Sequence, residues 1–418
     1  MKLVASFLAN VKKVLHWGPK GVFNHLRAMP DRLRIRRILL RGRNDMSVIP
    51  ARGITVIGEF TRFGSAPKVL RDFAASLRDA GIRYQTFNTD CHPQTPTEDT
   101  AGILTPLCDF HIRKFDTIVE ILPSIVPIID GIRKARIAFW EFESGFEYGY
   151  PDMPNESHVI AMSDFNFFYF QRTLPARVKV SKVLYPFRYE ECDLPSRDEV
   201  RRTYGMAPSD FVVFFNFDYG AGFNRKNPDG AMRAFAKAFR DEPNAKLVFK
   251  TKNAAAHPDR VRMLHGLAEK LGVVDRYVSI DTYVPQRDLF GLTNACDVYL
   301  SLHRGEGFGI TLAEAMVMGK PVVCTDYSST TEFCKPDCTI PVPYKIVKVR
   351  LGQIDHPYYR KVEKWAEASV DAAAVALRKL YADSEFRAEL GERARTSVLR
   401  QFSVEHFRKS IETSFELN

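Results

Sequence analysis

The sequence predicts an α/β protein in two domains, each built around a parallel β-sheet. Its 418 residues exceed the size at which a single hydrophobic core stops growing, which favours two domains. Strand-like apolar runs alternate with helix-like amphipathic stretches along most of the chain, and such alternation is typical of β-α-β units. Phe211 to Phe217 is almost continuously apolar, as expected for a parallel strand that is buried on both faces.

The composition is that of an ordinary globular protein, with 45% hydrophobic and 26% charged residues. No apolar run approaches the ~20 residues that cross a bilayer, so a membrane-spanning protein is not expected. The seven cysteines are odd in number and form no C-x-x-C pair, which favours reduced thiols and a cytoplasmic location. Cys334 and Cys338 lie close together in CKPDC, but without a neighbouring histidine they do not indicate a zinc site.

Residues 1–52 carry the whole net charge of +10, because they hold twelve Lys and Arg against two Asp. Their first part, residues 1–17, places apolar side chains on one stripe of a helix: Leu3, Val4, Phe7, Leu8, Val11, Val14 and Leu15. Lys12 and Lys13 interrupt the apolar centre that a secretory signal requires. We interpret 1–52 as a basic amphipathic leader that binds an anionic membrane surface.

Two alternatives exist for this leader. The helix could pack on the protein's own surface, with its charges merely solvated. Nucleic-acid binding by RLRIRRILLRGR is the weaker alternative, because Leu33, Ile35 and the run Ile38 to Leu40 form a packing face among the cations. The prediction is therefore a membrane partner and no nucleic-acid partner.

The first globular domain begins at Gly53. GITVIGEF is a predicted strand, TRFGSAP a loop that contains Gly64, and VLRDFAASLRDAG an amphipathic helix. Glycine in a loop after a strand lets the backbone approach a ligand closely, so Gly64 is a candidate binding residue. Further strands are predicted at 82–87 and 116–122.

RIAFWEFESGFE, residues 136–147, is predicted to run from a strand into an acidic, aromatic turn. Aromatic rings stack on the faces of sugars, and carboxylates accept hydrogen bonds from sugar hydroxyls. Glu141 and Glu143, beside Trp140, are therefore candidate substrate-binding residues. The alternative is a turn whose charges are solvated beside a buried tryptophan.

The second domain follows a linker at Pro186 to Pro195. Ser196 and Glu199 form a capping box that opens a short helix. After the long apolar strand, Arg225 and Lys226 lie in a predicted loop just before the next helix. Adjacent cations at that point could clamp a diphosphate.

Residues 297–326, DVYLSLHRGEGFGITLAEAMVMGKPVVCTD, hold most of the functional signal. Asp297 to Leu302 is predicted as a buried strand, His303 to Gly309 as a glycine-rich turn, and Thr311 to Met318 as a helix. Pro321 to Thr325 is the next strand. The segment is thus a β-α-β unit with a glycine-rich loop at the carboxyl end of its first strand.

Two carboxylates flank this loop, Glu306 in the turn and Glu314 on the helix. The free amides of the loop and the helix dipole suit an anion, whereas ionised carboxylates suit hydroxyl groups, because they only accept hydrogen bonds. A nucleotide sugar offers both, with hydroxyls for the glutamates and a diphosphate for the amides of Phe308 to Thr311. The alternative is two glutamates that lie at this spacing by chance on a solvated helix.

The remaining pattern completes the second domain. Further elements alternate as strand 246–251, helix 259–271, strand 277–280 and helix 286–294. After the segment described above, residues 342–360 are predicted to be irregular and 361–418 helical.

EGFGITLAE resembles the E-x7-E motif of retaining glycosyltransferases of the GT-B fold, family 4 (glycosyl transferases group 1), and GKPVVCTD fits the same pattern. The resemblance implies that Glu306 contacts the donor sugar and Glu314 the ribose. It also implies a donor-binding loop with these residues: Gly307, Phe308, Gly309, Ile310, Thr311 and Leu312. Arg225 and Lys226 match the family's diphosphate-binding cations, whose usual spacing is wider, so Lys226 is the firmer match. Together with Glu306 they are the predicted catalytic residues.

The same resemblance implies an α/β fold of two Rossmann-like domains that face each other across a cleft. We expect a leader at 1–52, an N-terminal acceptor domain at 53–186, a C-terminal donor domain at 187–395 and a helix at 396–418 that crosses back to the first domain. The family's acceptor-domain histidine has no clear match, since His111 precedes rather than follows its strand. The family needs no bound metal, and the chain has no D-x-D motif of the kind that metal-dependent sugar transferases carry.

The resemblance thus predicts a retaining hexosyltransferase that moves a sugar from a nucleotide diphosphosugar to a saccharide or lipid-linked acceptor, in surface polysaccharide or glycolipid synthesis. WEFE, residues 140–143, is similar to a WELE-like stretch in the acceptor domain of some members. The nucleotide sugar is a substrate, and no separate cofactor is expected. The protein is expected in the cytoplasm, peripherally attached to a membrane. Two alternatives share the fold, a nucleotide-sugar epimerase and a non-catalytic membrane-associated protein that binds nucleotide sugar.

Overall fold

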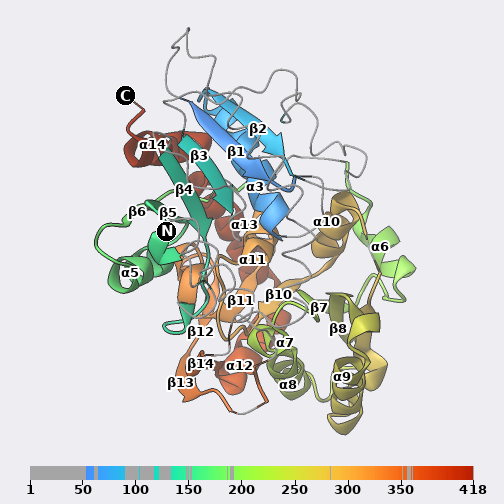
Figure 1. Ribbon diagram of the computed structural model, residues 1–418. Helices are drawn as coiled ribbons and strands as arrows, with labels where there is room; N and C mark the ends of the chain where they lie inside the picture. Colours follow the sequence, from blue (N-terminus) through green and yellow to red (C-terminus); the bar gives the residue numbers. More distant parts are fainter. Residues whose placement is uncertain are drawn as a thin grey trace.

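The computed structural model shows two α/β domains that lie against one another, with C-terminal helices beside them (Figure 1). Its described residues are 53–60, 65–89, 103, 117–121, 133–146, 150, 153–185, 187–188, 193–282, 284–350, 352–354, 359 and 361–417. The predicted leader at 1–52, Gly64 and His111 lie outside these residues. Within the described ranges, no helix is long and apolar enough to cross a membrane.

The first domain contains a six-stranded parallel sheet with the strand order β2-β1-β3-β4-β5-β6. Its strands are β1 (Ile54–Gly58), β2 (Tyr84–Asn88), β3 (Thr117–Ile121), β4 (Arg133–Ala138), β5 (His158–Ala161) and β6 (Lys179–Lys182). Its helical segments are α3 (Ser65–Asp79), η4 (Met153–Asn155) and α5 (Asp164–Thr173). β1 is buried along its whole length, and Val69, Leu70 and Phe73 of α3 are buried in the same core.

The second domain contains another six-stranded parallel sheet, in the order β12-β11-β10-β7-β8-β9. Its strands are β7 (Phe211–Asp218), β8 (Ala245–Lys252), β9 (Tyr277–Ile280), β10 (Val298–Ser301), β11 (Val322–Thr325) and β12 (Ile340–Val342). Its helical segments are α6 (Arg197–Thr203), α7 (Phe223–Lys226), α8 (Pro228–Ala238), η5 (Ala254–Ala256), α9 (Pro258–Lys270), η6 (Val274–Arg276), α10 (Gln286–Ala295), α11 (Ile310–Val317) and η7 (Ser328–Glu332). Two Rossmann-like domains with parallel sheets confirm the predicted fold class.

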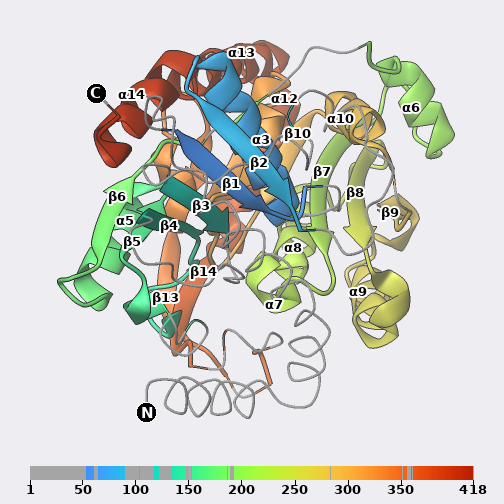
Figure 2. The same cartoon turned by 45° about the horizontal axis from the view of Figure 1, so that its top comes forward.

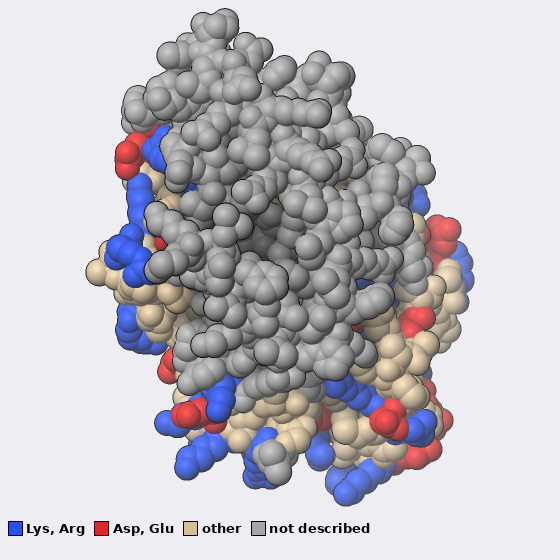
Figure 3. Space-filling view, in the orientation of Figure 1, with Lys and Arg blue, Asp and Glu red and all other residues tan. Residues whose placement is uncertain are grey.

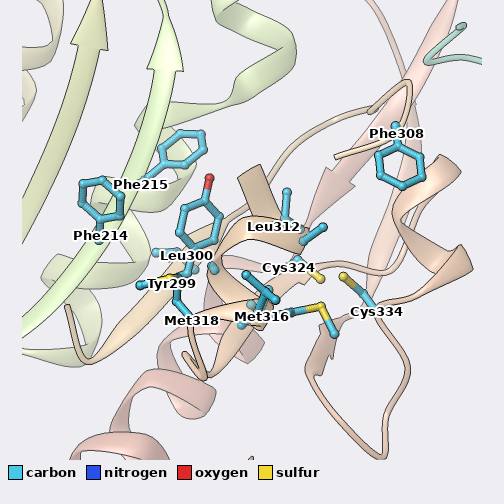
Figure 4. Packing of buried hydrophobic residues seen from close by; sticks show 14 of the residues in the cluster. Phe214, Phe215, Tyr299, Leu300, Phe308, Leu312, Met316, Met318, Cys324 and Cys334 are labelled. Carbon is cyan, nitrogen blue, oxygen red and sulfur yellow. The ribbon is translucent and has the colours of Figure 1, made fainter. Parts of the chain in front are cut away.

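The core of the second domain lies between its sheet and α11 (Figure 4). Tyr299 of β10 lies edge-on to Phe214 and Phe215 of β7, with ring centroids 6.0 and 6.4 Å apart. Leu312 and Met316 of α11 are buried in the same cluster. Because α11 is buried from Leu312 to Val317, it is apolar along that stretch except at one carboxylate. This packing fixes the start of α11, where the glycine-rich loop ends.

A third, two-stranded sheet departs from the sequence prediction. Residues 342–360 are predicted to be irregular and 361–418 helical, yet β13 (Tyr344–Lys348) pairs antiparallel with β14 (Lys364–Ala368). The prediction is wrong there, because each strand is stabilised by cross-strand pairs that no local pattern reveals. Trp365 of β14 packs into an aromatic cluster of the first domain, so this sheet joins the two domains.

The C-terminal helices are α12 (Val370–Ala382), α13 (Ser384–Gln401) and α14 (Val404–Phe415). α14 lies on the first domain, beside α3 and β6 (Figure 2). Phe407 of α14 meets Phe73 of α3 edge-on, with ring centroids 5.6 Å apart. The Ser410 Oγ accepts a hydrogen bond from the Leu184 amide at 3.2 Å. The chain thus returns from the second domain to cover the first.

The described surface carries charges of both signs, which are interspersed along the margin visible in Figure 3. This mixture agrees with the sequence, in which Lys and Arg balance Asp and Glu outside residues 1–52. The excess positive charge therefore belongs to the leader, which lies outside the described residues.

Candidate active site

The glycine loop, residues 302–309, connects the end of β10 to the start of α11. It enters the helix at Gly309, whose φ of 97° lies in the left-handed region that glycine adopts without strain. The loop rests on η7, where the Ser328 Oγ accepts a hydrogen bond from the Glu306 amide at 2.8 Å. These contacts hold Glu306 at the carboxyl end of the sheet, which is where α/β proteins bind ligands.

Two cations on α7 face Glu306. Lys226 Nζ lies 2.5 Å from Glu306 Oε1, and Arg225 Nη1 lies 3.2 Å from Oε2. The sequence predicts both cations in a loop, whereas the structure places them in the short helix α7, which ends at Asn227 with a φ of 59°. The Asn227 Nδ2 donates to the Leu302 carbonyl at 2.7 Å, so α7 is tied to the glycine loop.

The charges of this cluster interact strongly, because Glu306 and Arg225 are buried and Lys226 is half-buried. Burial alone would raise the pKa of Glu306, but Lys226 and Arg225 outweigh it and lower that pKa to about 2. Glu306 is therefore ionised at neutral pH. Arg225 also donates from Nη1 to the Gly305 carbonyl at 2.7 Å, which holds its guanidinium against the loop.

Glu141, in the turn after β4 of the first domain, lies at the same cluster. Its Oε1 is 3.9 Å from Arg225 Nη2 and accepts a hydrogen bond from the Tyr359 hydroxyl at 3.1 Å. The Arg225 guanidinium lies over the Tyr359 ring, 5.9 Å from its centroid. Glu143, by contrast, is exposed. Burial raises the pKa of Tyr344, and the negative charge of Glu143 raises it further. The structure thus unites four of the predicted residues: Glu306, Arg225, Lys226 and Glu141.

The two domains touch at their backbones beside this cluster. A Cβ atom on Gly305 would lie 2.4 Å from the Glu141 carbonyl oxygen, and a Cβ on Gly307 would lie 3.0 Å from the Phe139 Cβ. Position 305 therefore accepts only glycine unless one chain segment moves. The glycines of the loop serve the close approach of the first domain as well as any approach of a ligand.

The side chains of the other predicted loop residues differ in exposure. Phe308 stacks on Tyr185 of the first domain with ring centroids 4.0 Å apart, and Leu312 is buried in the core (Figure 4). Their side chains fill the interior, so only their backbone amides could serve a ligand. Ile310 and Thr311 are half-buried at the start of α11.

Glu314, in the middle of α11, is buried and faces the first domain. Burial raises its pKa to about 7, with Lys68 of α3 opposing the rise and Asp72 adding to it. The Gln286 Nε2 donates a hydrogen bond to Glu314 Oε1 at 3.4 Å. Glu314 therefore changes its charge near neutral pH, whereas Glu306 does not.

Polar side chains also lie at the carboxyl ends of β7 and β8, on the same edge of the sheet as the glycine loop. The Asn253 Nδ2 donates to Asp218 Oδ1 at 2.8 Å. The Thr251 Oγ1 donates to Asp281 Oδ1 at 2.9 Å. Groups of this kind at this edge suit the polar atoms of a nucleoside.

Sequence reasoning missed three residues of the site. Tyr359 lies in a stretch predicted to be irregular, and Asn166 of α5 contacts the loop from the first domain. His303 is buried inside the loop, with Nδ1 3.1 Å from Ser301 Oγ and Nε2 3.3 Å from the Tyr327 carbonyl oxygen. Burial lowers the pKa of His303 to about 4, so it is neutral. The HRGEGFG context could have marked His303, whereas the other two have no local signal.

Comparisons with known proteins agree with this geometry. A family model described as glycosyl transferases group 1 matches residues 197–339, which include Lys226, Glu306 and Glu314. A comparison with curated protein sequences finds no match.

Solved structures resemble nearly the whole chain. HepE of Anabaena, in complex with UDP and glucose, is similar with a TM-score of 0.60 and 17% identity, over 88% of this chain and 100% of that one. Sucrose-phosphate synthase of Thermosynechococcus elongatus has a TM-score of 0.59 and 14% identity, over 87% and 98%. WaaG, a glycosyltransferase involved in lipopolysaccharide biosynthesis, has a TM-score of 0.57 and 18% identity, over 86% and 99%. Likeness at such low identity shows the fold, and with the matched segment it supports a glycosyltransferase of GT-B type.

Proposed function

We propose that the protein is a retaining hexosyltransferase that moves a sugar from a nucleotide diphosphosugar to a saccharide or lipid-linked acceptor. The observation that carries the proposal is the ion cluster of Glu306, Lys226 and Arg225 on the second domain, with Glu141 facing it from the first. Transfer between two ligands, one on each domain, needs charged and hydrogen-bonding groups where the domains meet.

Lys226 and Arg225 are proposed to hold the donor diphosphate. Within the protein both cations pair with the single carboxylate of Glu306. A diphosphate that enters beside them competes for both cations, which leaves Glu306 able to accept hydrogen bonds from hydroxyls of the donor sugar. When the bond from sugar to phosphate breaks, the leaving diphosphate gains charge, and both cations stabilise it.

The nucleoside is proposed to lie along the carboxyl edge of the second sheet. Glu314 would accept hydrogen bonds from the ribose, and the polar groups beyond β7 and β8 would face the base. The complex of HepE with UDP and glucose supports a UDP-linked donor. The likeness to WaaG supports an acceptor used in surface polysaccharide or glycolipid synthesis.

The test is a screen of nucleotide sugars for thermal stabilisation, followed by an acceptor-dependence assay with the best donor. Nucleoside diphosphate should appear only when a saccharide or lipid-linked acceptor is present. Isomerisation of the donor without acceptor would indicate an epimerase, and binding without turnover would indicate a non-catalytic protein. The proposal includes no bound metal, so activity should survive EDTA, and loss that magnesium or manganese restores would contradict that part.

Nucleotide affinity should rise with pH through about 7. Below that pH Glu314 is protonated and accepts hydrogen bonds poorly, because its pKa is raised to about 7 by burial. The stability of the fold should change with pH in the opposite direction. The pKa of Glu314 is higher in the folded than in the unfolded chain, so the native state binds the proton more tightly. The stability that this proton contributes is lost as pH rises through about 7. Calorimetric titration with nucleoside diphosphate measures the affinity, and melting temperatures measure the stability, each across this pH range. Glu314→Gln should flatten both slopes relative to the wild-type protein, and slopes as steep as those of the wild type would refute the assignment.

We further propose that residues 1–52 hold the enzyme on an anionic membrane surface in the cytoplasm. Full-length protein should sediment with anionic vesicles at low salt and be partly released at high salt, since an attraction of roughly 1 kcal/mol per cation is screened. A chain that lacks 1–52 has no net charge and should stay in solution, folded, because β1 begins only at Ile54. An insoluble or unfolded truncated chain would show instead that the leader packs on the fold.

A further inference from the structure

The side chain of Asn166, in the first turn of α5, bridges the two domains and has no exposed surface. Its Oδ1 accepts a hydrogen bond from the Trp140 amide at 2.6 Å. Its Nδ2 lies 3.2 Å from the Gly307 carbonyl oxygen and 2.7 Å from Ser329 Oγ, and it donates to both. A backbone amide only donates and a backbone carbonyl only accepts, so these partners fix which way the carboxamide faces.

Asn166 joins the two chain segments that carry the facing carboxylates. Trp140 immediately precedes Glu141 in the turn after β4, and Gly307 immediately follows Glu306 in the glycine loop. One carboxamide therefore touches the residue next to each of the two site glutamates. A displacement of this side chain breaks its hydrogen bond to at least one of the two segments.

The same amide also supports Glu306 through η7. The Ser329 Oγ accepts two hydrogen bonds, one from the Asn166 Nδ2 at 2.7 Å and one from the Ser163 Oγ at 2.9 Å. The neighbouring Ser328 accepts the hydrogen bond of the Glu306 amide. Glu306 thus lies between Gly307 and η7, and Asn166 contacts both Gly307 and Ser329 of η7.

We infer that Asn166 is a positioning residue, which sets the place of Glu141 relative to Glu306, and this inference rests on the proposed transfer reaction. The donor sugar and the acceptor meet between these two carboxylates. Displacements of about 1 Å in such geometry can cost about 10²-fold in rate. The Asn166 side chain donates to the loop at the Gly307 carbonyl, and within the described chain it makes no hydrogen bond to a side chain proposed to bind the donor, so it acts through the two segments that carry the glutamates.

The alternative is that Asn166 only holds the two domains together. Replacing Lys182 distinguishes this alternative from the positioning role. Lys182 Nζ lies 2.5 Å from Glu332 Oε1, so it joins β6 of the first domain to η7. Its ammonium group pairs with Asp164 and Glu332, and within the described chain it makes no hydrogen bond or ion pair with the turn after β4 or with the glycine loop. Lys182→Ala therefore weakens the same domain contact without touching either segment.

The experiment compares Asn166→Asp, Asn166→Ala and Lys182→Ala with the wild-type full chain, in steady-state kinetics and in amide hydrogen exchange followed by mass spectrometry. Asn166→Asp keeps an oxygen for the Trp140 amide and loses the donor to Gly307. Both Asn166 variants should lose about 10²-fold in kcat, while KM for the donor stays within about threefold, because the proposed contacts to the diphosphate and the ribose are intact. Lys182→Ala should retain kcat.

Hydrogen exchange tests the same inference without relying on activity. Peptides that cover 305–309 should exchange faster in both Asn166 variants, whereas peptides that cover 139–142 should exchange faster in Asn166→Ala alone. Unchanged exchange of 305–309 in both variants would overturn the positioning role, as would an equal loss of kcat in Lys182→Ala. If wild-type protein transfers no sugar, the proposed function fails, and the exchange data still decide whether Asn166 holds the two segments. Should Asn166→Ala fail to fold, the near-isosteric Asn166→Asp carries both measurements.

Discussion

Replacing either Glu306 or Lys226 by alanine should lower kcat/KM about 30- to 10³-fold, or roughly 2 to 4 kcal/mol of barrier. The Glu306 Oε1 and the Lys226 Nζ lie 2.5 Å apart, and each is proposed to contact the donor where charge changes during the reaction. Steady-state kinetics of each purified variant measure the loss. Full activity in either variant would contradict the site.

A double variant separates catalysis from stability. Glu306→Ala leaves the buried Arg225 and the half-buried Lys226 without the carboxylate that they share, which is destabilising. Adding Lys226→Ala removes one of the two cations, so the melting temperature should partly recover while activity stays low. Lys320→Ala is the matched control: Lys320 Nζ donates to the Asn294 carbonyl at 2.6 Å beyond the other end of α11, so its loss should leave kcat/KM unchanged.

Gly305→Ala should lower both kcat and the melting temperature. The added Cβ would lie 2.4 Å from the Glu141 carbonyl oxygen, which belongs to the backbone and cannot rotate away. The turn that carries Glu141 must then move off the glycine loop, and overpacking of this kind costs about 1 to 3 kcal/mol. Because the two glutamates separate, the loss of kcat should be about 10²-fold. Thermal unfolding and steady-state kinetics measure the two effects.

Gly266→Ala provides the comparison. Gly266 lies inside α9, and a Cβ there meets no atom within 4 Å. The replacement should stabilise the protein by up to about 1 kcal/mol, because alanine favours a helix interior. Wild-type kcat in Gly305→Ala would show that the contact between turn and loop has no part in the reaction.

The parts of the fold that the sequence predicts well are those with local signals. The strand at 277–280 and the N-cap at Ser196 appear where they are expected, because apolar pattern and capping chemistry are local. β13 and β14 were not predicted, since each depends on a partner across an intervening segment.

The site shows the same division. Glu306 and Glu314 stand in a motif within one β-α-β unit, and Lys226 lies next to a recognisable helix start, so sequence alone could nominate them. Asn166 bonds to a residue 141 positions away, and Tyr359 donates to one 218 positions away. No pattern within a window of sequence can report such neighbours, because the chain must fold before they meet.

During synthesis the first domain leaves the ribosome long before α14, which lies on α3. Phe73 of α3 meets Phe407 only after α14 has emerged. The nascent first domain therefore keeps an apolar strip uncovered while the second is being translated, and chains in such a state bind chaperones or aggregate. Maturation of the domain that is made first thus waits until α14 has been translated.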